Sequence, residues 1–318
     1  MKIVEMDWKP LALVPVLALV VLPFVGSPST WLTLTVAGLA MGMIIFIIAS
    51  GLTLVFGLMD VMNFAHGVFI AVGAYVAASA MKAFGGGLAA LAPAMLCAML
   101  VAGALGLFFE RVIIKPVYGQ HLKQILITTG GLIVAEQLIH VVWGPDLLPL
   151  ARPEALRGAF LFGDVALERY RLAAVVVGLA IFAAMTLTLN RSKLGLLIRA
   201  GVENKEMVEA MGYRIRLLFI GVFVAGSALA GLGGALWGMY QEVVTVHIGA
   251  QMMVLIFIVI IIGGLGSVTG CFVGALLVGL VANYVGYLSP KIALGSNILL
   301  MVIVLLWRPQ GLYPVSKQ

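Results

Sequence analysis

Three polar side chains interrupt an apolar part of the sequence, "DVMNFAHGVF" (60–69). Asp60, Asn63 and His66 follow one another at intervals of three residues among Val, Met, Phe and Ala. A charge at the centre of a bilayer costs about 2.5–3.5 kcal/mol on the insertion scale, so polar side chains inside membranes usually face protein or water. Two interpretations follow. The residues mark a helix break beside a substrate pathway, or they form a turn near the membrane surface, where polar groups cost little.

A second pair of polar side chains lies in the apolar stretch "ITTGGLIVAEQLIHVVW" (127–143). Glu136 and His140 are four residues apart and share one face of a helix. As a functional site they would be a proton-linked pair or a polar lining. As a structural feature they would be an ion pair near the outer surface of the membrane, anchored by Trp143, because Trp is enriched at that depth.

Sequence patterns of common enzyme sites are absent. The chain contains no G-x-x-x-x-G-K-[ST] phosphate loop, no H-E-x-x-H metal motif and no G-x-S-x-G nucleophile turn. The glycine-rich segment "GGLGSVTG" (263–270) has no Lys and no strand beside it, so we expect it to allow irregular backbone or close helix packing. Cys97 and Cys271 both lie in apolar runs. These patterns predict neither an enzyme nor a cofactor or metal site in this chain.

The composition is that of a membrane protein. Hydrophobic residues make up 63% of the chain, charged residues only 10%, and the mean hydropathy is +1.17. Soluble domains average about 45–50% apolar and about 25% charged residues. A formal charge of +6 would suggest nucleic acid in a soluble protein, but Lys and Arg also collect in the cytoplasmic loops of membrane proteins. We therefore expect no nucleic-acid partner and an all-α fold, a polytopic helix bundle in the lipid bilayer.

Ten apolar stretches define the expected helices of one transmembrane domain, residues 1–318. They lie at 11–27, 31–57, 61–81, 88–109, 122–143, 172–190, 216–240, 251–262, 271–288 and 292–307. A full span needs roughly 20 apolar residues, so the short stretch 251–262 predicts a broken or half-spanning helix. We interpret 11–27 as an extra N-terminal membrane helix, because acidic residues offset the basic ones before it, unlike the basic start of a signal peptide.

The distribution of basic residues predicts the orientation. They concentrate in 110–123, in 190–216 and in the tail from Arg308. If these segments share one side with the N-terminus, that side holds 13 of the 19 Lys and Arg residues. Lys and Arg are enriched in cytoplasmic loops, so we expect both termini and the loop 190–216 in the cytoplasm. The segment 144–171 is then the main external loop.

Two short segments resemble each other within the chain. "GVFIAVGA" (67–74) and "GCFVGALL" (270–277) each follow a glycine-containing break in an apolar run. Transporters built from structural repeats show such paired interruptions. Short matches also arise by chance in a chain with 38 glycines. A repeat and a coincidence both remain open.

The segment "VENKEMVEAMGYRIR" (202–216) has an apolar stripe among charged residues. Met207 and Met211 are four residues apart, and Val208 lies beside them. A short helix cannot bury such a stripe alone. It either packs on its own bundle or docks in a groove of a partner.

Three motifs together resemble a known family. "GLTLVFGLMDVMNFAHGVFIAVGAYVA" (51–77), "GGLGSVTGCFVGALLVGL" (263–280) and "RPQGLYP" (308–314) are similar to the permease subunits of branched-chain amino acid ABC transporters. Asn-Phe-Ala-His-Gly at 63–67 indicates the subunit type that carries this motif, rather than its sister subunit. The resemblance covers residues 31–314.

The resemblance implies a multi-subunit importer in the bacterial inner (cytoplasmic) membrane. Two permeases, usually different ones, form the channel, two ABC ATPases bind ATP-Mg beneath it, and a periplasmic binding protein delivers the substrate. It implies a translocation pathway that includes Asp60, Asn63, His66, Gly264, Gly266, Ser267 and Thr269. It also implies an ATPase-coupling helix within 190–216 that includes Glu203, Glu206, Met207, Val208, Glu209, Met211 and Gly212.

Two features depart from the family pattern. The helix at 11–27 is more typical of the sister subunit, and Glu136 with His140 stands where apolar or amide residues are expected. The wider family also includes importers of urea, amides and aromatic acids, so these are alternative substrates. A stand-alone secondary carrier that uses Glu136 and His140 for proton coupling is the alternative from a different class of function.

Overall fold

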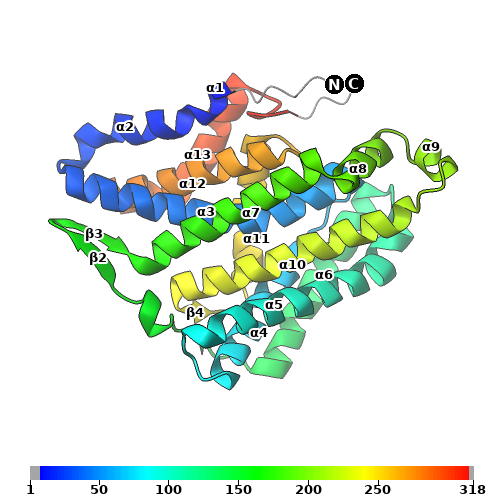
Figure 1. The fold of residues 1–318 in the computed structure, drawn as a ribbon, viewed down its shortest axis with the longest axis horizontal. Helices are drawn as coiled ribbons and strands as arrows, with labels where there is room; N and C mark the ends of the chain where they lie inside the picture. The colour runs from blue at the N-terminus through cyan, green and yellow to red at the C-terminus, as the bar shows by residue number, and fades with distance from the viewer. Residues whose placement is uncertain (1–7, 315–318) are drawn as a thin grey trace.

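Helices occupy all ten apolar stretches in the computed structural model, which describes residues 8–314 (Figure 1). It does not describe the side chains of Trp8, Lys9, Val202, Glu203, Lys205 and Leu294. Within this part of the chain, the helical segments that are long and apolar enough to cross a membrane are α3 (Pro28–Met59), α4 (His66–Ala83), α5 with its continuation (Leu88–Val117), α6 (His121–Trp143), α7 (Arg169–Arg191), α10 (Ile215–Gln241) and α12 (Val268–Leu288). The other α-helices are α1 (Trp8–Leu11), α2 (Leu13–Val25), α8 (Lys193–Glu203), α9 (Lys205–Ala210), α11 (Ile248–Gly263) and α13 (Pro290–Trp307). The predicted all-α membrane bundle is confirmed.

The extra N-terminal helix expected at 11–27 is present but short. α2 has 13 residues, whereas a full span needs roughly 20. Gly26 ends it in a left-handed conformation (φ 81°), and Ser27 caps the start of α3. The indole of Trp31 donates to the carbonyl of Ala18 (2.7 Å), which fastens α2 to α3. By length, α2 alone does not cross a bilayer.

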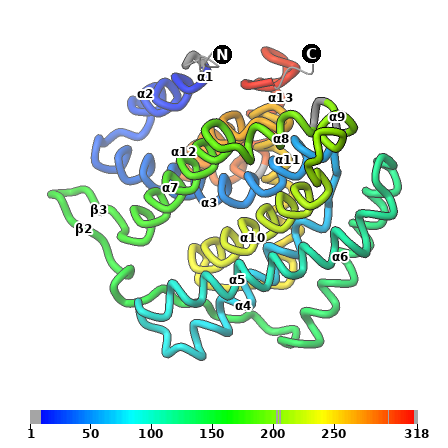
Figure 2. Tube along the Cα trace, turned by 45° about the vertical axis from the view of Figure 1, so that its right-hand side comes forward, coloured from blue at the N-terminus to red at the C-terminus, as the bar shows by residue number. Residues whose placement is uncertain are grey.

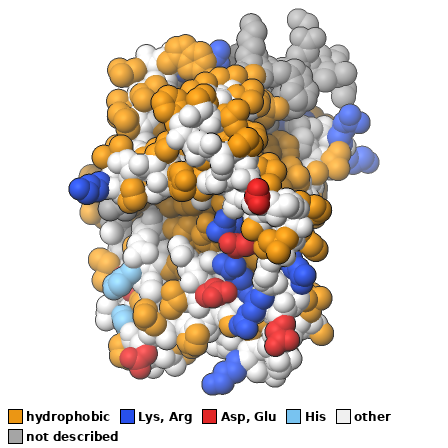
Figure 3. Space-filling view, turned by 90° about the vertical axis from the view of Figure 1, so that its left-hand side faces the viewer, with side chains coloured by type: hydrophobic (Ala, Val, Ile, Leu, Met, Phe, Trp, Pro, Cys, Tyr) orange, Lys and Arg blue, Asp and Glu red, His pale blue; other side chains and the backbone are white. Residues whose placement is uncertain are grey.

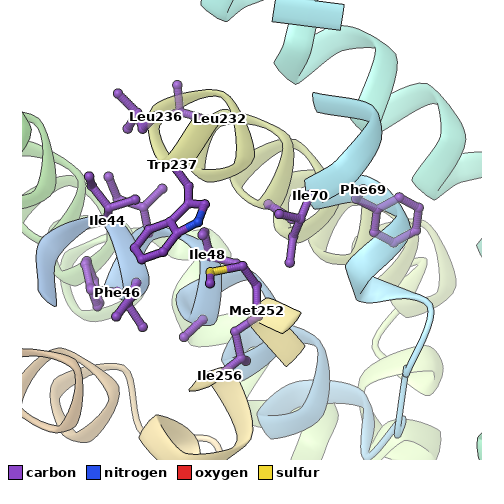
Figure 4. Packing of buried hydrophobic residues seen from close by; sticks show 14 of the residues in the cluster. Ile44, Phe46, Ile48, Phe69, Ile70, Leu232, Leu236, Trp237, Met252 and Ile256 are labelled. Atoms are coloured by element: carbon purple, nitrogen blue, oxygen red, sulfur yellow. The ribbon is translucent and has the colours of Figure 1, made fainter. Parts of the chain in front are cut away.

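α3 lies at the centre of the bundle. It packs against α7, α10 and α12, while α10 also packs against α4 and α5 (Figures 1 and 2). α3 is hydrophobic on all sides, as expected for a helix that is buried within a bundle. Figure 4 shows part of this core, where Trp237 of α10 lies among Ile44 and Ile48 of α3 and Met252 of α11.

Glycines bring the central helices into backbone contact. Gly51 of α3 faces Gly226 of α10, and a Cβ on Gly51 would overlap the Gly226 carbonyl. Gly67 of α4 faces Gly249 of α11 in the same way. Small residues allow the close approach on which helix packing in membranes depends. The glycines therefore serve packing as well as turns.

Two three-helix units have the same succession of elements. In each, a long helix (α3 or α10) ends at an acidic residue in the left-handed conformation, Asp60 (φ 53°) or Glu242 (φ 59°). These are the two non-glycine residues with positive φ in the described part of the chain. A break and a second helix follow, α4 or α11. A four-residue turn with two positive-φ glycines, 84–87 or 264–267, then leads to α5 or α12.

The two units run in opposite directions. Where α3 meets α10, Ile48 contacts Gly233 and Gly51 contacts Gly226, so these two helices are antiparallel. The units therefore form an inverted repeat, an architecture that many transporters share. This repeat does not relate 67–74 to 270–277. Those segments lie in α4 and α12, whereas α4 corresponds to α11, so their similarity reflects two helix starts rich in small residues.

The two ends of the bundle differ. Between α6 and α7 the chain forms β1 (Leu148–Pro149), the 3-10 turn η3 (Glu154–Leu156) and a hairpin of β2 (Ala159–Phe162) and β3 (Val165–Glu168). β1 pairs with β4 (Val243–Val244), which follows α10. Figure 3 looks onto the hairpin end and shows acidic and basic side chains mixed over one half and hydrophobic side chains over the other. α8 and α9 lie at the opposite end (Figure 1).

Arg152 ties the α6–α7 connection to the end of α10. Its guanidinium donates to the carbonyls of Met239 (2.9 Å) and Tyr240 (2.8 Å). It also pairs with the carboxylates of Glu168 (3.2 Å) and Glu242 (3.4 Å). The last carbonyls of a helix lack partners within the helix and carry partial negative charge, so a cation is favoured there. The connection is therefore an ordered structure and not a loose loop.

Candidate functional site

Asp60 ends α3 at the surface of the bundle. Its φ of 53° is in the left-handed region, which Asp tolerates better than most residues. Its side chain is 56% exposed, and one carboxylate oxygen lies 3.9 Å from Nε2 of His121 at the start of α6. Asp60 therefore fits the interpretation of a turn at the membrane surface.

Asn63 and His66 lie inside the protein, each only 1% exposed. Nε2 of His66 lies 3.1 Å from the carbonyl of Ile48, and because a carbonyl only accepts, Nε2 carries the hydrogen in this bond. Nδ1 of His66 and both amide atoms of Asn63 are buried and have no partner within the described chain. Buried polar atoms in native proteins almost always have one. Three buried polar atoms of this break are therefore unsatisfied, which distinguishes Asn63 and His66 from the exposed Asp60.

Two residues of α6 hold the backbone of the same break, and the sequence analysis missed both. Oε1 of Gln124 accepts from the N–H of Met62 (3.3 Å), and Oγ1 of Thr128 accepts from the N–H of Phe64 (3.1 Å). Both side chains are fully buried. Their spacing of four residues could have identified them, because it places two polar groups on one face of an apolar helix.

The second predicted break adjoins the first. A Cβ on Gly57 of α3 would lie 2.5 Å from Cα of Gly266, so the two backbones touch. The rings of Phe64 and Phe257, one from the first break and one from α11, have centroids 4.9 Å apart. Two segments separated by about 200 residues of chain thus form one region of the molecule.

The glycine-rich segment forms a tight turn between α11 and α12. Gly264 (φ 98°) and Gly266 (φ 81°) adopt backbone conformations that other residues rarely adopt. The hydroxyl of Ser267 accepts from the N–H of Gly270 (3.0 Å) and caps α12, and Thr269 is partly buried in the first turn of that helix. The predicted irregular backbone is therefore present, shielded by α3 and by the C-terminal segment.

The C-terminal "RPQGLYP" motif closes the same region. The N–H groups of Leu312 and Tyr313 donate to the carbonyls of Ile262 and Gly263, both at 2.9 Å. These bonds satisfy two carbonyls at the end of α11 that have no partner within the helix. All three motifs that carried the family resemblance therefore meet at one place.

Glu136 pairs with a residue outside its own helix. Its carboxylate lies 3.7 Å from Nδ1 of His247, in the break between α10 and α11, and the ring of His140 lies 6.4 Å from that of His247. The indole of Trp143 donates to the hydroxyl of Ser79 (2.8 Å). The partner of Glu136 is thus His247, and the predicted pair of Glu136 with His140 is wrong. The spacing of residues along one helix cannot reveal a side chain that comes from another helix.

The predicted coupling residues lie in α9 and at its two ends. Asn204 caps it by accepting from the N–H of Met207 (2.9 Å), and Gly212 (φ 86°) follows its end. Met207 and Met211 are 62% and 69% exposed, whereas Val208 is 4% exposed. The apolar stripe is therefore divided, with Val208 packed inward and the two methionines facing outward.

Acidic side chains flank these methionines. Glu206 and Glu209 are exposed, while Glu203 ends α8 and its side chain lies outside the described part of the molecule. The exposed surface of this segment thus combines an apolar pair with carboxylates.

A comparison with protein families decides which family this is. The model described as "Branched-chain amino acid transport system / permease component" matches residues 34–307, most of the chain. The chain belongs to this family. With its long apolar helices, this family member is a multi-pass membrane protein.

Curated relatives of this permease match it over most of its length. It is 32% identical over 292 residues to the high-affinity branched-chain amino acid transport system permease protein BraD of Pseudomonas aeruginosa, covering 87% of this chain and 94% of BraD. It is 28% identical over 287 residues to the permease protein LivH of Escherichia coli K12 (86% and 92% covered). It is 27% identical over 305 residues to LivM of the same bacterium (86% and 69% covered). No solved structure matches the chain.

Proposed function

We propose that this chain is a permease subunit of an ABC importer in the bacterial inner membrane, with both termini in the cytoplasm. The match to the family over residues 34–307 carries the proposal. BraD and LivH are named as branched-chain amino acid transport permeases, so branched-chain amino acids are the proposed substrates. Urea, amides and aromatic acids are the competing substrates that a test must separate.

The proposed partners are a second, different permease, two ABC ATPases and a periplasmic binding protein. The similarity to both LivH and LivM, two permeases of one bacterium, supports the second permease. The exposed Met207 and Met211 on α9 support docking of the ATPases, since an exposed apolar pair on a helix fits a groove on a partner. The chain lacks a phosphate-binding loop, so ATP-Mg would bind to these partners.

The proposed translocation pathway passes the two adjoining breaks. It includes Asp60, Asn63, His66, Gly264, Gly266, Ser267 and Thr269. The contact between the breaks supports this assignment, and so do the buried polar atoms without partners, which a passing polar solute or water would satisfy. In this conformation Asn63 and His66 are enclosed, and we propose that the path opens between the breaks during transport.

The assembled complex tests the function. Purified alone, the chain is expected neither to bind nor to hydrolyse ATP. Combined in liposomes with its second permease, two ATPases and a loaded binding protein, it is expected to import labelled leucine, isoleucine or valine. Excess urea, amide or aromatic acid should not compete for this uptake. ATPase activity of the chain alone, or failure to purify with any ATPase, would overturn the proposal.

Substitutions in the first break test the pathway. Asn63→Leu and His66→Leu each remove hydrogen-bonding groups worth about 1 kcal/mol. We expect uptake to fall roughly fivefold for each change, because 1.4 kcal/mol corresponds to a factor of ten. The ATPases should remain bound. Asp60→Asn, at the exposed end of the break, is the control and should reduce uptake much less.

Thiol labelling provides the independent measurement. Cysteines are introduced at 63 and 66 in a background that lacks Cys97 and Cys271. A water-soluble reagent should reach both positions in at least one nucleotide state. Protection in every state, together with normal uptake by the Leu variants, would show that the break is purely structural.

A further inference from the structure

Glu110 is a buried carboxylate that the proposed pathway does not use. Among the described acidic side chains it alone is buried, at 2% exposed. It begins the π-helical turn η1 (Glu110–Ile114), which continues as the 3-10 turn η2 (Lys115–Val117). π-helical turns are rare and often mark functional sites, and a buried charge is costly unless it is paired.

Only one oxygen of this carboxylate is satisfied. The hydroxyl of Tyr118 donates to Oε1 of Glu110 (3.2 Å), while Oε2 is buried and has no partner within the described chain. Partial burial raises the pKa of the Tyr118 phenol, and the adjacent Glu110 raises it further, so Tyr118 remains a neutral donor. Oε2 of Glu110 is therefore free to accept from a second donor.

Hydrogen bonds, together with the covalent link between Val117 and Tyr118, connect this carboxylate to the first break. Val117, next to Tyr118, accepts from Nε2 of Gln124 at its carbonyl (3.1 Å). The same Gln124 accepts from the N–H of Met62 through Oε1 (3.3 Å). The irregular end of α5 is thus linked through one side chain to the backbone between α3 and α4.

Arg216 is a basic residue near the Glu110 end of this link. It is the second residue of α10 and follows α9 by a short turn. α5 and α10 pack antiparallel, with Gly231 against Ala102 and Gly106 against Ser227, so the start of α10 lies toward the irregular end of α5. The charge of Arg216 lowers the pKa of the Tyr118 phenol at that end, and Arg216 forms no ion pair with any described side chain. Its side chain is exposed. An unpaired guanidinium and a half-satisfied carboxylate therefore belong to helix ends that pack side by side.

We propose that Glu110 is a positioning residue that transmits movement of α9 to the α3–α4 break, by accepting Arg216 on Oε2 in a second conformation. The inference rests on the proposed function, because docked ATPases would move α9. Bonds between arginine and a carboxylate are strong and directional, and coupling between sites runs through packed and hydrogen-bonded groups with two arrangements. Closing this pair shifts Tyr118, Gln124 and the break together.

Charge removal in the reconstituted complex tests the relay. Glu110→Gln keeps the size and the bond from Tyr118 but removes the charge. The stimulation of ATPase activity by loaded binding protein should fall at least about fivefold, the lower range of measured couplings between sites. Arg216→Gln should give the same loss. Arg214→Gln, a matched change at an exposed arginine two residues earlier, should not.

Two further variants separate positioning from mere folding. Exchanging the charges, Glu110→Arg with Arg216→Glu, should restore at least half of the stimulation. Cysteines at 110 and 216, in a chain that lacks Cys97 and Cys271, lie too far apart for a disulfide when they replace an arginine–carboxylate pair. A bifunctional thiol reagent about 8 Å long, roughly twice the disulfide Cβ–Cβ distance, should cross-link them in one nucleotide state and not in the other. If the charge-exchanged protein does not fold, the cross-linking result alone tests the proposal. Normal stimulation by the Glu110→Gln complex, or no cross-link in any state, overturns the relay. A wild-type complex that fails to assemble or transport rejects the proposed function instead.

Discussion

Replacing Met207 of α9 and Met211, the residue that follows this helix, by glutamate is expected to release the ATPases from the membrane complex. Met207 and Met211 face outward, so the double variant places two charges on an apolar pair that also has Glu206 and Glu209 beside it. We expect both methionines to be hot-spot residues of the ATPase interface, and changing such a residue costs about 2 kcal/mol or more. Each change should therefore weaken binding about 30-fold, since 1.4 kcal/mol is a factor of ten. Co-purification of the ATPases with the tagged permease measures the loss.

Two control variants accompany this one: an apolar replacement at the same two positions and a glutamate at a distant exposed position. Met207→Leu with Met211→Leu keeps the apolar surface and should keep the ATPases bound. Leu161→Glu adds a charge to an equally exposed side chain of the hairpin, at the opposite end of the bundle, and should have no effect on them. An intact complex in the glutamate variant would show that the methionines contact lipid or their own bundle.

The second large effect concerns the crossing of α3 and α10, where Gly51→Ala is expected to destabilise the whole bundle. A Cβ at this position would overlap the carbonyl of Gly226, so the two backbones must separate along their length. Overpacking of this kind costs about 3 kcal/mol or more when the neighbour is backbone and cannot rotate away. The melting temperature in detergent should fall by roughly 6–12 °C.

A matched glycine-to-alanine substitution elsewhere in α10 should not destabilise the bundle. Gly221 of α10 is exposed, and a Cβ there meets no other atom within 4 Å. Gly221→Ala should therefore be neutral or gain up to about 1 kcal/mol, because alanine favours the helix over glycine. Equal melting temperatures for Gly51→Ala and the wild type would mean that the two helices do not touch at this point.

Local features of the fold were predictable from sequence. Membrane helices satisfy their backbone hydrogen bonds within one segment, so each apolar stretch predicts its own helix. Even the short stretch 251–262 corresponds to α11, and the glycines after it form the expected irregular turn. The polar residues at 60–66 predicted the end of α3 in the same way. Each of these features depends on neighbours along the chain, which a single sequence displays.

Contacts between distant segments were not predictable. The approach of Gly57 to Gly266 depends on how α3 packs against the α11–α12 turn, and no periodicity in either segment encodes it. For the same reason Glu136 was assigned to His140 and not to His247. Gln124 went unnoticed because its importance comes from the unpaired backbone of another element. The sequence grouped Val208 with Met207 and Met211 in one apolar stripe, but Val208 is buried because it packs against another part of the chain.

The opposite directions of the two three-helix units constrain how this chain is inserted into the membrane during its synthesis. α3–α4–α5 and α10–α11–α12 are alike in design but must enter the bilayer in opposite senses. Apolar helices carry no preference for direction, which comes from the charges of flanking segments. Between the units, 190–216 contains Arg191, Lys193, Arg199, Lys205, Arg214 and Arg216. The segment that is proposed to contact the ATPases would thus also act earlier, during membrane insertion. Its basic residues would keep the start of α10 in the cytoplasm and so prevent the second unit from inserting in the wrong orientation.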